Sequence, residues 1–309
     1  MKKVILDVDT GIDDALAIAY AVHSPELYVI GLTTCYGNVT AWEATRNTLF
    51  VLEKLGKNIP VYEGALEPLV RGEREEYARK VHGENGLGNV KIDLENSEGK
   101  MNDYAIEFIL QKVKEFPNEI TLISVGPLTN LALAIQKEPQ ITQLFKEVII
   151  MGGAIYRHGN VTPYAEANIY CDPEAADIVL QSGIPIILVG LDVTMKTLLP
   201  LSEIKKWREN EKGDHLFLAD MTEFYIKFYE NFQPGIGGCA LHDPLAVGVA
   251  IDRSFVTTKQ EKVKVILEGE ETGKTIPTFS NRAPILVCNQ VDEKRFLNHF
   301  LSRVGQSNE

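Results

Sequence analysis

Four aspartates lie within eight residues near the beginning of the chain. The run VILDVDTGIDDALAIAYAV contains Asp7, Asp9, Asp13 and Asp14 but no His or Cys. Carboxylates this close together need a cation between them, and hard oxygen ligands suit calcium or magnesium rather than zinc or copper. The spacing therefore predicts a site for Ca2+ or Mg2+.

The same run changes from a strand pattern to a helix pattern. A short apolar stretch is followed by a turn at Gly11 and then by good helix formers. Asp9 is nearer than Asp7 to the end of the strand, so we expect Asp9 to face the site. An alternative is that Asp13 and Asp14 only cap the helix, but capping gives no reason for a third carboxylate at Asp9. We therefore favour a binding site.

Two known aspartate loops fit this run less well. An EF-hand loop counted from Asp7 would need its glycine one position after Gly11, and a bidentate Glu where the chain has Ile18. The phosphotransferase loop of haloacid-dehalogenase-like phosphatases also has Asp-x-Asp after a first strand, but it has Thr or Val at the position of Gly11.

The composition is that of an ordinary globular protein of 309 residues, with 45% hydrophobic and 24% charged residues. A formal net charge of −12 argues against nucleic-acid polymers and anionic membranes, which favour clustered Lys and Arg. Four widely spaced cysteines form no C-x-x-C pair, and we find no signal-peptide pattern and no membrane span. We expect a cytoplasmic protein with a small-molecule ligand.

Apolar strand-like runs alternate with helical patterns along the chain. After the first strand, the expected strands are residues 27–33, 120–124, 148–151 and 184–189, and the expected helices are residues 102–115, 128–136, 173–181, 216–231 and 290–304. This alternation predicts an α/β fold, an open and mainly parallel sheet with helices on both faces, in a single domain over residues 1–309. Residues 262–269 and 283–290 bracket GEETGK and predict a hairpin or a meander. Residues 71–100, rich in charge, Gly and Asn, predict a long functional loop.

In such a sheet, ligands bind beyond the carboxyl ends of the strands, where this chain is polar or rich in glycine. TTCYGN ends in Asn38, and the segments VGPLTN and MGG follow two later strands. The segments GNVTPYAEANIYCDPEAAD and LHDPLAVG add Asn160, Glu166, Asn168, His242 and Asp243. These side chains suit a polyhydroxylated ligand.

With these motifs in order, the chain resembles the inosine-uridine nucleoside hydrolase family from Val4 to about Val249. DVDTGIDDALAI matches the signature loop of the family, with Thr10 where Pro is common, and YGN, HGENGLG, SVGPLTN, MGG, TPYAEAN and HDP follow in the family's order. The resemblance implies hydrolysis of the N-glycosidic bond of ribonucleosides to free base and ribose, in nucleoside salvage. It also implies a Rossmann-like sheet, a Ca2+ ion that holds the ribose diol and a water, and a homodimer or homotetramer.

The resemblance also implies the metal ligands. Asp9, Asp14 and Asp243 would bind Ca2+ through their side chains, and Val125 through its backbone carbonyl. Asp9 would also be the general base that takes a proton from the attacking water. An alternative for Asp243 is a helix N-cap, which Pro244 after it would favour.

The ribose contacts follow from the same resemblance. Asp13 and Asn168 would bind the 2′ and 3′ hydroxyls, Asn38 the diol or the water, and Asn160 and Glu166 the 5′ hydroxyl. An oxocarbenium-like transition state gains from carboxylates and amides placed around the sugar ring. For Asn160 or Asn168 taken alone, ordinary turn chemistry is the alternative.

On the base side, the resemblance implies that His242 protonates or stabilises the leaving base, because a near-neutral imidazole pKa suits this role. His82 would belong to a loop that closes over the base, and Met151 of the MGG motif would also contact the substrate. Tyr225 and Tyr229, one helical turn apart, would form an aromatic wall, with core packing as the alternative.

Base preference stays open, because Ala167 occupies a position where many members of the family have Phe, and inosine and uridine are both candidates. Two other classes of protein are weighed against this reading. A haloacid-dehalogenase-like phosphatase would use Asp7 as a covalent nucleophile with Mg2+. A non-catalytic nucleoside-binding or ribose-binding protein would give Asp9 and His242 no catalytic role.

Overall fold

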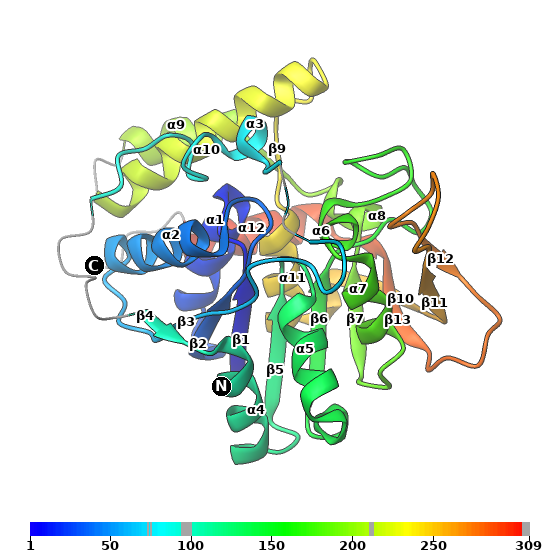
Figure 1. Ribbon diagram of the computed structural model, residues 1–309. Helices are drawn as coiled ribbons and strands as arrows, with labels where there is room; N and C mark the ends of the chain where they lie inside the picture. The colour runs from blue at the N-terminus through cyan, green and yellow to red at the C-terminus, as the bar shows by residue number, and fades with distance from the viewer. Residues whose placement is uncertain (73, 75, 94–100, 210–212, 305–309) are drawn as a thin grey trace.

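The computed structural model describes residues 1–309 except 73, 75, 94–100, 210–212 and 305–309. Its centre is a sheet of nine strands with helices packed around it (Figure 1). In order across the sheet, the strands are β10 (Val256–Glu261), β13 (Ile285–Val291), β7 (Ile186–Val189), β6 (Glu147–Met151), β5 (Ile120–Ser124), β1 (Lys2–Val8), β2 (Leu27–Thr34), β3 (Val61–Glu63) and β4 (Met101–Asp103).

The sheet is parallel except at one edge. Neighbouring strands from β13 to β4 are parallel, whereas β10 pairs antiparallel with β13. Parallel strands need crossover segments, and helices supply most of them here. The predicted fold class, an open and mainly parallel sheet with helices on both faces, is confirmed.

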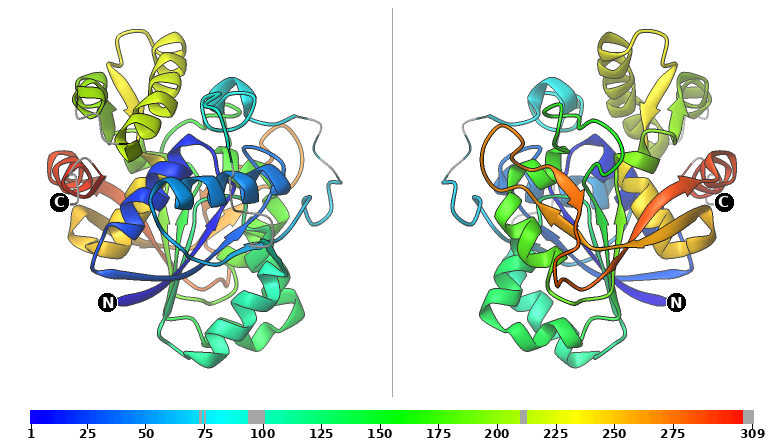
Figure 2. Two further views of the ribbon diagram at one scale, coloured as in Figure 1. Left: turned by 90° about the vertical axis from the view of Figure 1, so that its left-hand side faces the viewer. Right: turned by 90° about the vertical axis from the view of Figure 1, so that its right-hand side faces the viewer.

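Helices cover both faces of the sheet, as the two side views in Figure 2 show. The helices are α1 (Ile12–Val22), α2 (Ala41–Lys54), α3 (Arg79–His82), α4 (Ala105–Glu115), α5 (Thr129–Lys137), α6 (Ala167–Cys171), α7 (Pro173–Leu180), α8 (Leu191–Thr194), α9 (Leu201–Glu209), α10 (Gly213–Phe232), α11 (His242–Ile251) and α12 (Glu293–Val304), with two 3-10 turns at Pro139–Gln143 and Arg253–Phe255. In the described ranges, no helix combines the length and apolar character needed to cross a membrane.

The two faces of the sheet are the two halves of the hydrophobic core. Along β1, Val4, Leu6 and Val8 pack on the side of α1, α2, α11 and α12, whereas Ile5 packs on the side of α4, α5 and α7. This alternation follows from the two-residue period of a strand. Because both faces are buried, the central strands are almost continuously apolar.

The structure corrects two of the predicted elements. Helix α4 begins at Ala105 rather than at residue 102, because Tyr104 has a left-handed φ of 83° and residues 101–103 form edge strand β4. The predicted late hairpin is wrong in its partner: β11 (Val263–Val265) pairs with β12 (Thr275–Pro277) in a small separate sheet. The second predicted strand of that hairpin is β13, which lies inside the central sheet.

The remaining two-stranded sheet, β8 (Leu198–Pro200) with β9 (Gly238–Ala240), flanks the pair of helices α9 and α10. In Figure 2 these two helices lie beyond the carboxyl end of β1. The predicted functional loop at residues 71–100 contributes α3 close to α10, while residues 94–100 lie outside the described part of the chain.

Candidate active site

A cluster of buried carboxylates lies where β1 ends and two helices begin. Asp13 and Asp14 are in the first turn of α1, and Asp243 is in the first turn of α11, which packs against α1. One carboxylate oxygen from each of these three residues lies within 4.8 Å of the others. The three side chains are almost fully buried, with exposed fractions of 6%, 0% and 2% in that order.

Asp9 adjoins this cluster from the end of β1. Its Oδ2 accepts a hydrogen bond of 2.7 Å from the backbone N–H of Asn38, but its Oδ1 is buried without a hydrogen-bond partner. Two glycines leave room for this carboxylate. A Cβ atom at Gly37 would lie 2.1 Å from the Asp9 carboxylate, and a Cβ atom at Gly126 would lie 2.8 Å from it. The close packing fixes where the Asp9 side chain can be.

Asp7 faces a different set of groups. It is level with Thr33 on β2 and Ser124 on β5, and both hydroxyls donate to its carboxylate, as does the Asn130 side-chain amide. Residues two apart would share a face of a continuing strand, but β1 ends at Val8, and Asp9 therefore takes its own direction. Asp7 is thus satisfied inside the fold.

Asp14 both caps α1 and belongs to the cluster. Its carboxylate accepts backbone N–H bonds from Asp9 and Gly11 at 3.2 and 2.9 Å, and a side-chain N–H bond from Asn38 at 3.1 Å. The N-cap alternative for Asp243 is wrong, because α11 already begins at His242.

Burial raises the pKa of the three clustered aspartates and of Asp9. Repulsion from neighbouring carboxylates raises the pKa of Asp9, Asp14 and Asp243 further. Asp13 Oδ1, like Asp9 Oδ1, is buried without a hydrogen-bond partner. Unpartnered oxygens in a group of buried carboxylates are the environment that a divalent cation stabilises. The cluster therefore fits an oxygen-liganded metal ion.

The amide of Asn168 connects α6 to the ends of β5 and β6 beside the carboxylate cluster. Its Nδ2 donates to the carbonyls of Val125 and Met151 at 2.7 and 3.1 Å. A carbonyl oxygen has two lone pairs, so the Val125 oxygen can still bind a cation. Asn168 itself is held by Glu166, whose carboxylate accepts three backbone N–H bonds, from Gly153, Asn168 and Ile169.

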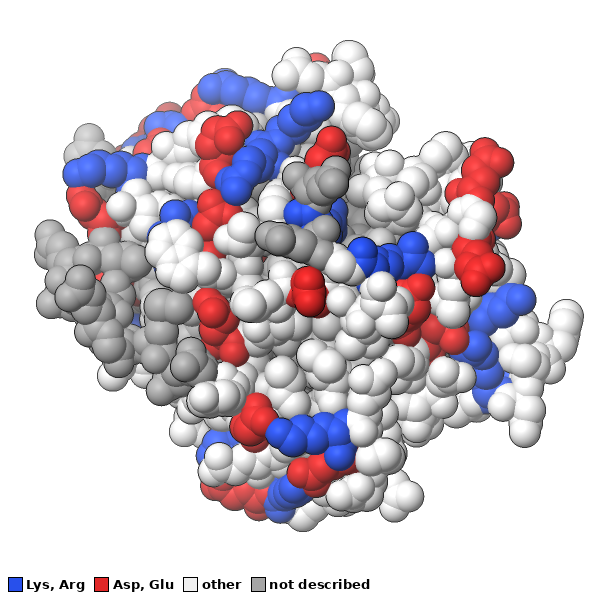
Figure 3. All heavy atoms as spheres, viewed as in Figure 1, with Lys and Arg blue, Asp and Glu red and all other residues white. Residues whose placement is uncertain are grey.

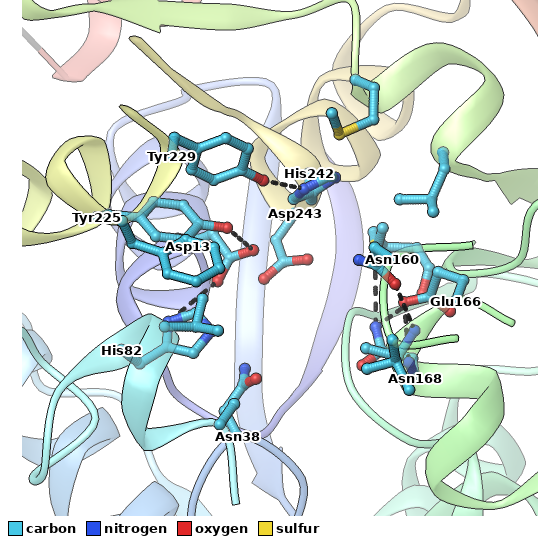
Figure 4. A pocket seen from close by; sticks show the side chains of 18 of the residues that line it. Asp13, Asn38, His82, Asn160, Glu166, Asn168, Tyr225, Tyr229, His242 and Asp243 are labelled. Carbon is cyan, nitrogen blue, oxygen red and sulfur yellow. Dashed lines mark hydrogen bonds and ion pairs between the residues drawn. The ribbon is translucent and has the colours of Figure 1, made fainter. Parts of the chain in front are cut away.

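A pocket of about 210 Å³ opens above these groups. Figure 4 shows His82, Tyr225 and Tyr229 across the pocket from Asn160, Glu166 and Asn168, with His242 and Asp243 between them. Of the predicted site residues, the pocket brings together Asp13, Asn38, His82, Val125, Met151, Asn160, Glu166, Asn168, Tyr225, Tyr229, His242 and Asp243. Asp9 and Asp14 are not in its lining and reach it through Asn38.

The aromatic wall is hydrogen-bonded to the polar groups of the site. Tyr225 donates to Asp13 Oδ2 at 3.3 Å, and the Tyr229 hydroxyl lies 2.6 Å from His242 Nε2. His82 stacks on Tyr225 with a centroid distance of 5.4 Å. Both tyrosines are buried and both line the pocket, so each packs in the core and also forms part of the aromatic wall.

His242 does not have the near-neutral pKa expected from the sequence, and the pKa of His82 is lowered as well. Burial lowers the pKa of His242 to about 3, and the charge of Arg157 contributes to this shift. Burial also lowers the pKa of His82 to about 4. Both imidazoles are therefore neutral at neutral pH, and His242 is fixed by Tyr229 on one nitrogen and by Thr194 Oγ1, 2.7 Å away, on the other.

Sequence reasoning missed several residues of the pocket. They include Arg157, Leu191, Met195, Phe228, Phe232 and Gln233. The residues from α10 recur at three- and four-residue intervals after Tyr225, so the helical period would have found them. Arg157 and Leu191 carried no such signal, because they lie outside the recognisable motifs.

Together, the fold and the site define a class of protein: an α/β enzyme whose mainly parallel sheet presents buried carboxylates that could hold a metal ion to a pocket lined with amides and aromatic rings. Comparison with known proteins then gives the family. The chain matches the sequence profile of the inosine-uridine preferring nucleoside hydrolases over residues 4–298 and belongs to this family.

Individual relatives are similar over nearly their whole length. Uridine nucleosidase 1 of Arabidopsis thaliana is 42% identical over 277 residues, which cover 89% of this chain and 81% of the relative. The inosine-uridine preferring nucleoside hydrolase of Leishmania major is 37% identical over 314 residues, covering 98% of each chain. The structure of a purine-preferring ribonucleoside hydrolase from Gardnerella vaginalis superposes with a TM-score of 0.94 at 43% identity, covering 98% of each chain.

The protein is therefore an enzyme that hydrolyses the N-glycosidic bond of ribonucleosides. The phosphatase alternative is not favoured, because Asp7, its required nucleophile, is hydrogen-bonded inside the fold. The binding-protein alternative is not favoured either, since the relatives are named as hydrolases and nucleosidases.

Proposed function

We propose that this nucleoside hydrolase uses Ca2+ held by Asp9, Asp14 and Asp243 and by the Val125 carbonyl, with Asp13 beside it. The observation that carries this proposal is the buried carboxylate cluster with unpartnered oxygens on Asp9 and Asp13. An all-oxygen site with room for water and a diol suits Ca2+, which accepts six to eight ligands. When bound, the cation would supply Lewis-acid chemistry to a water and to the ribose diol.

The protein groups have separate roles in this proposal. Asp9 accepts a proton from the attacking water through its unpartnered Oδ1. Asp13, Asn168 and Asn38 orient the 2′ and 3′ hydroxyls, and their negative or dipolar oxygens stabilise positive charge on the ribosyl ring.

At the far end of the ribose, Asn160 and Glu166 are placed beside the 5′ hydroxyl. Asn160 Oδ1 accepts the backbone N–H of Ala167, which leaves its amide nitrogen to face a ligand. The Glu166 carboxylate anchors the segment that carries Asn168, so its main effect on the ribose acts through that segment.

The base would lie against His82, Tyr225, Tyr229 and His242, with Met151 at the floor. We propose uridine and inosine as substrates, since similar proteins carry names of both kinds. His242 is neutral and hydrogen-bonded to Tyr229, so it would stabilise the leaving base by orienting the Tyr229 hydroxyl rather than by giving up a proton of its own.

We also propose that the chain forms one domain over residues 1–309 and assembles as a homodimer or homotetramer in the cytoplasm. The four cysteines support a reducing compartment, because all four are free and buried.

The test starts from protein stripped of metal with a chelator. It is mixed with inosine, uridine, adenosine and cytidine, with and without added Ca2+, and the released ribose is measured by a reducing-sugar assay. The proposal predicts Ca2+-dependent release from inosine and uridine. Release that is equal with and without Ca2+ would refute the metal role, and no release from any nucleoside would refute the proposed substrates.

A further inference from the structure

Arg157 lies on the wall of the pocket but takes no part in the family motifs of this chain. It belongs to the segment between β6 and α6, and its side chain is one of those that line the pocket. Its Nη1 donates a hydrogen bond of 3.0 Å to the carbonyl of Leu191, the first residue of α8. Arg157 is an exposed residue, and this bond holds its guanidinium group beside α8 on the pocket wall.

In the proposed function, the base lies against His242, which is also positioned by α8. The same short helix α8 carries Thr194, whose hydroxyl is 2.7 Å from His242 Nδ1. Arg157 and His242 are thus both attached to α8. The carboxylate cluster depends on other elements, the first turns of α1 and α11.

The guanidinium group has donors left over. It carries five N–H groups in a planar fork, and the bond to Leu191 uses one. In the part of the chain that the structure describes, Arg157 forms no ion pair with a carboxylate. Among the described lining residues, Arg157 alone is a Lys or Arg, whereas Asp13, Glu166 and Asp243 are acidic.

Negative charge develops on the base during the reaction. When the bond between C1′ and the base nitrogen breaks, its electron pair stays with the base. In uracil and hypoxanthine this charge spreads to a carbonyl oxygen on the ring edge far from the sugar, which a guanidinium group can bind. Cytosine and adenine have an amino group there, which is a donor and is repelled by a second donor.

We propose that Arg157 binds this carbonyl oxygen, stabilises the charge on the departing base, and selects bases with a carbonyl over bases with an amino group at that position. The inference rests on the proposed function, which supplies the reaction. Atoms and charge balance without a further reactant. The bond between C1′ and the base nitrogen breaks, the oxygen of water bonds to C1′, and one proton of that water goes to Asp9 and then to solvent. The base takes up one proton from solvent, and Arg157 stays protonated throughout.

The test compares the unaltered enzyme with Arg157→Met, loaded with Ca2+, on two substrate pairs and one artificial substrate. The pairs are inosine with adenosine and uridine with cytidine, and the artificial substrate is p-nitrophenyl β-D-ribofuranoside, whose leaving group is already a stable anion. We expect kcat/KM to fall about 10- to 100-fold for inosine and uridine, the effect of losing a charged hydrogen bond. For the other three substrates we expect a change of no more than about 3-fold, because no such bond is lost.

Lys196→Met is the matched control. Lys196 follows α8, is exposed and does not line the pocket, so this variant removes the same charge nearby without touching the base. We expect its rates on all five substrates to stay within about 2-fold of those of the unaltered enzyme, since surface substitutions are usually this mild.

The results separate the two proposals. An equal loss on all five substrates, or no loss on any, with an active unaltered enzyme would overturn the role of Arg157 and leave the proposed function intact. If the unaltered enzyme hydrolyses no nucleoside in the presence of Ca2+, the proposed function itself fails. A selective loss in Lys196→Met would also overturn the inference, because a general charge effect would then explain the selectivity.

Discussion

Asp9 occupies a space that its glycine neighbours leave open. A side chain at Gly37 or Gly126 would collide with its carboxylate, and Asn38 holds one of its oxygens by a backbone N–H. The other oxygen is buried and unpartnered, which costs free energy in the metal-free protein. Residues that are destabilising on their own and tightly positioned by their surroundings are typical of catalytic groups.

Asp9→Asn should therefore separate stability from activity. Without metal, the variant loses one of several buried, mutually repelling carboxylates, so we expect a higher Tm than that of the metal-free parent. We also expect kcat to fall about 10²- to 10⁴-fold, the usual contribution of a general base. Thermal unfolding and ribose release on the same samples check both results, and a variant that keeps full activity would exclude Asp9 as the base.

Helix α1 carries two of the clustered aspartates, and its first turn is secured by a residue far along the chain. Gly11 at the N-cap has no side chain to accept a hydrogen bond. Instead, His82 Nδ1 accepts the backbone N–H of Ile12 at 3.1 Å. This nitrogen must be unprotonated to accept, which agrees with the lowered pKa of the imidazole.

Two substitutions at position 82 test this contact. His82→Ala removes the acceptor and should lower the free energy of unfolding by about 1 kcal/mol, as loss of a helix cap does. His82→Asn places an amide oxygen near the same position and should recover most of that stability, although the ring that stacks on Tyr225 is gone. Urea unfolding of both variants measures the difference; equal losses would show that stacking, rather than capping, is the stabilising contact.

The elements that sequence could predict were those with a strong local pattern. Buried strands such as β5 and amphipathic helices such as α12 were found because their apolar periods are set within the segment. The pairing of β13 was missed because its partners, β7 and β10, lie elsewhere in the chain and strand alternation does not specify a partner.

The same distinction applies to the site. Asp13, Asp14 and Asp243 could be predicted from motifs at strand ends, and the structure brings them together. Arg157 could not, since its place on the pocket depends on a contact with α8 that no local pattern encodes.

On the face drawn in Figure 3, charged side chains are mixed rather than gathered by sign. Among the residues coloured there, Lys and Arg side chains are interspersed with Asp and Glu. Several form ion pairs, for example Arg208 with Asp220 and Glu223. The net charge of −12 therefore acts mainly as a diffuse field, which favours the approach of cations.

Ca2+ should stabilise the protein strongly, because it would join β1, α1 and α11 at one point. At a Ca2+ concentration about 100 times Kd, the expected gain is about 2.7 kcal/mol, which for a chain of 309 residues is a rise in Tm of about 4 °C. Mg2+ should raise Tm less, since it loses its water ligands reluctantly. Differential scanning calorimetry of the stripped protein measures these shifts.

Asp220→Asn provides the control for this experiment. Asp220 lies on α10 in a surface ion pair, so its variant should show the same Ca2+ shift as the parent. A Ca2+ shift that is absent from the parent, or that is lost in Asp220→Asn, would argue against the carboxylate cluster as the binding site.

The four cysteine thiols should be unreactive in the folded enzyme. All are buried, and burial raises the pKa of Cys171 and of Cys288 to about 12, so little reactive thiolate forms at pH 8. We expect no rapid reaction of the native protein with Ellman's reagent, and reaction of all four cysteines in guanidinium chloride. Fast modification of a native thiol would contradict the packing around that residue.

The cluster joins opposite parts of the chain, and this has a consequence during protein synthesis. Asp9, Asp13 and Asp14 leave the ribosome among the first residues, but Asp243 follows only after most of the sheet has been made. At about 5–20 residues per second, the early carboxylates wait tens of seconds for their partner. A nascent chain that ends before Asp243 therefore cannot complete the cluster, and if the cluster holds the metal as proposed, such a fragment should not hydrolyse nucleosides.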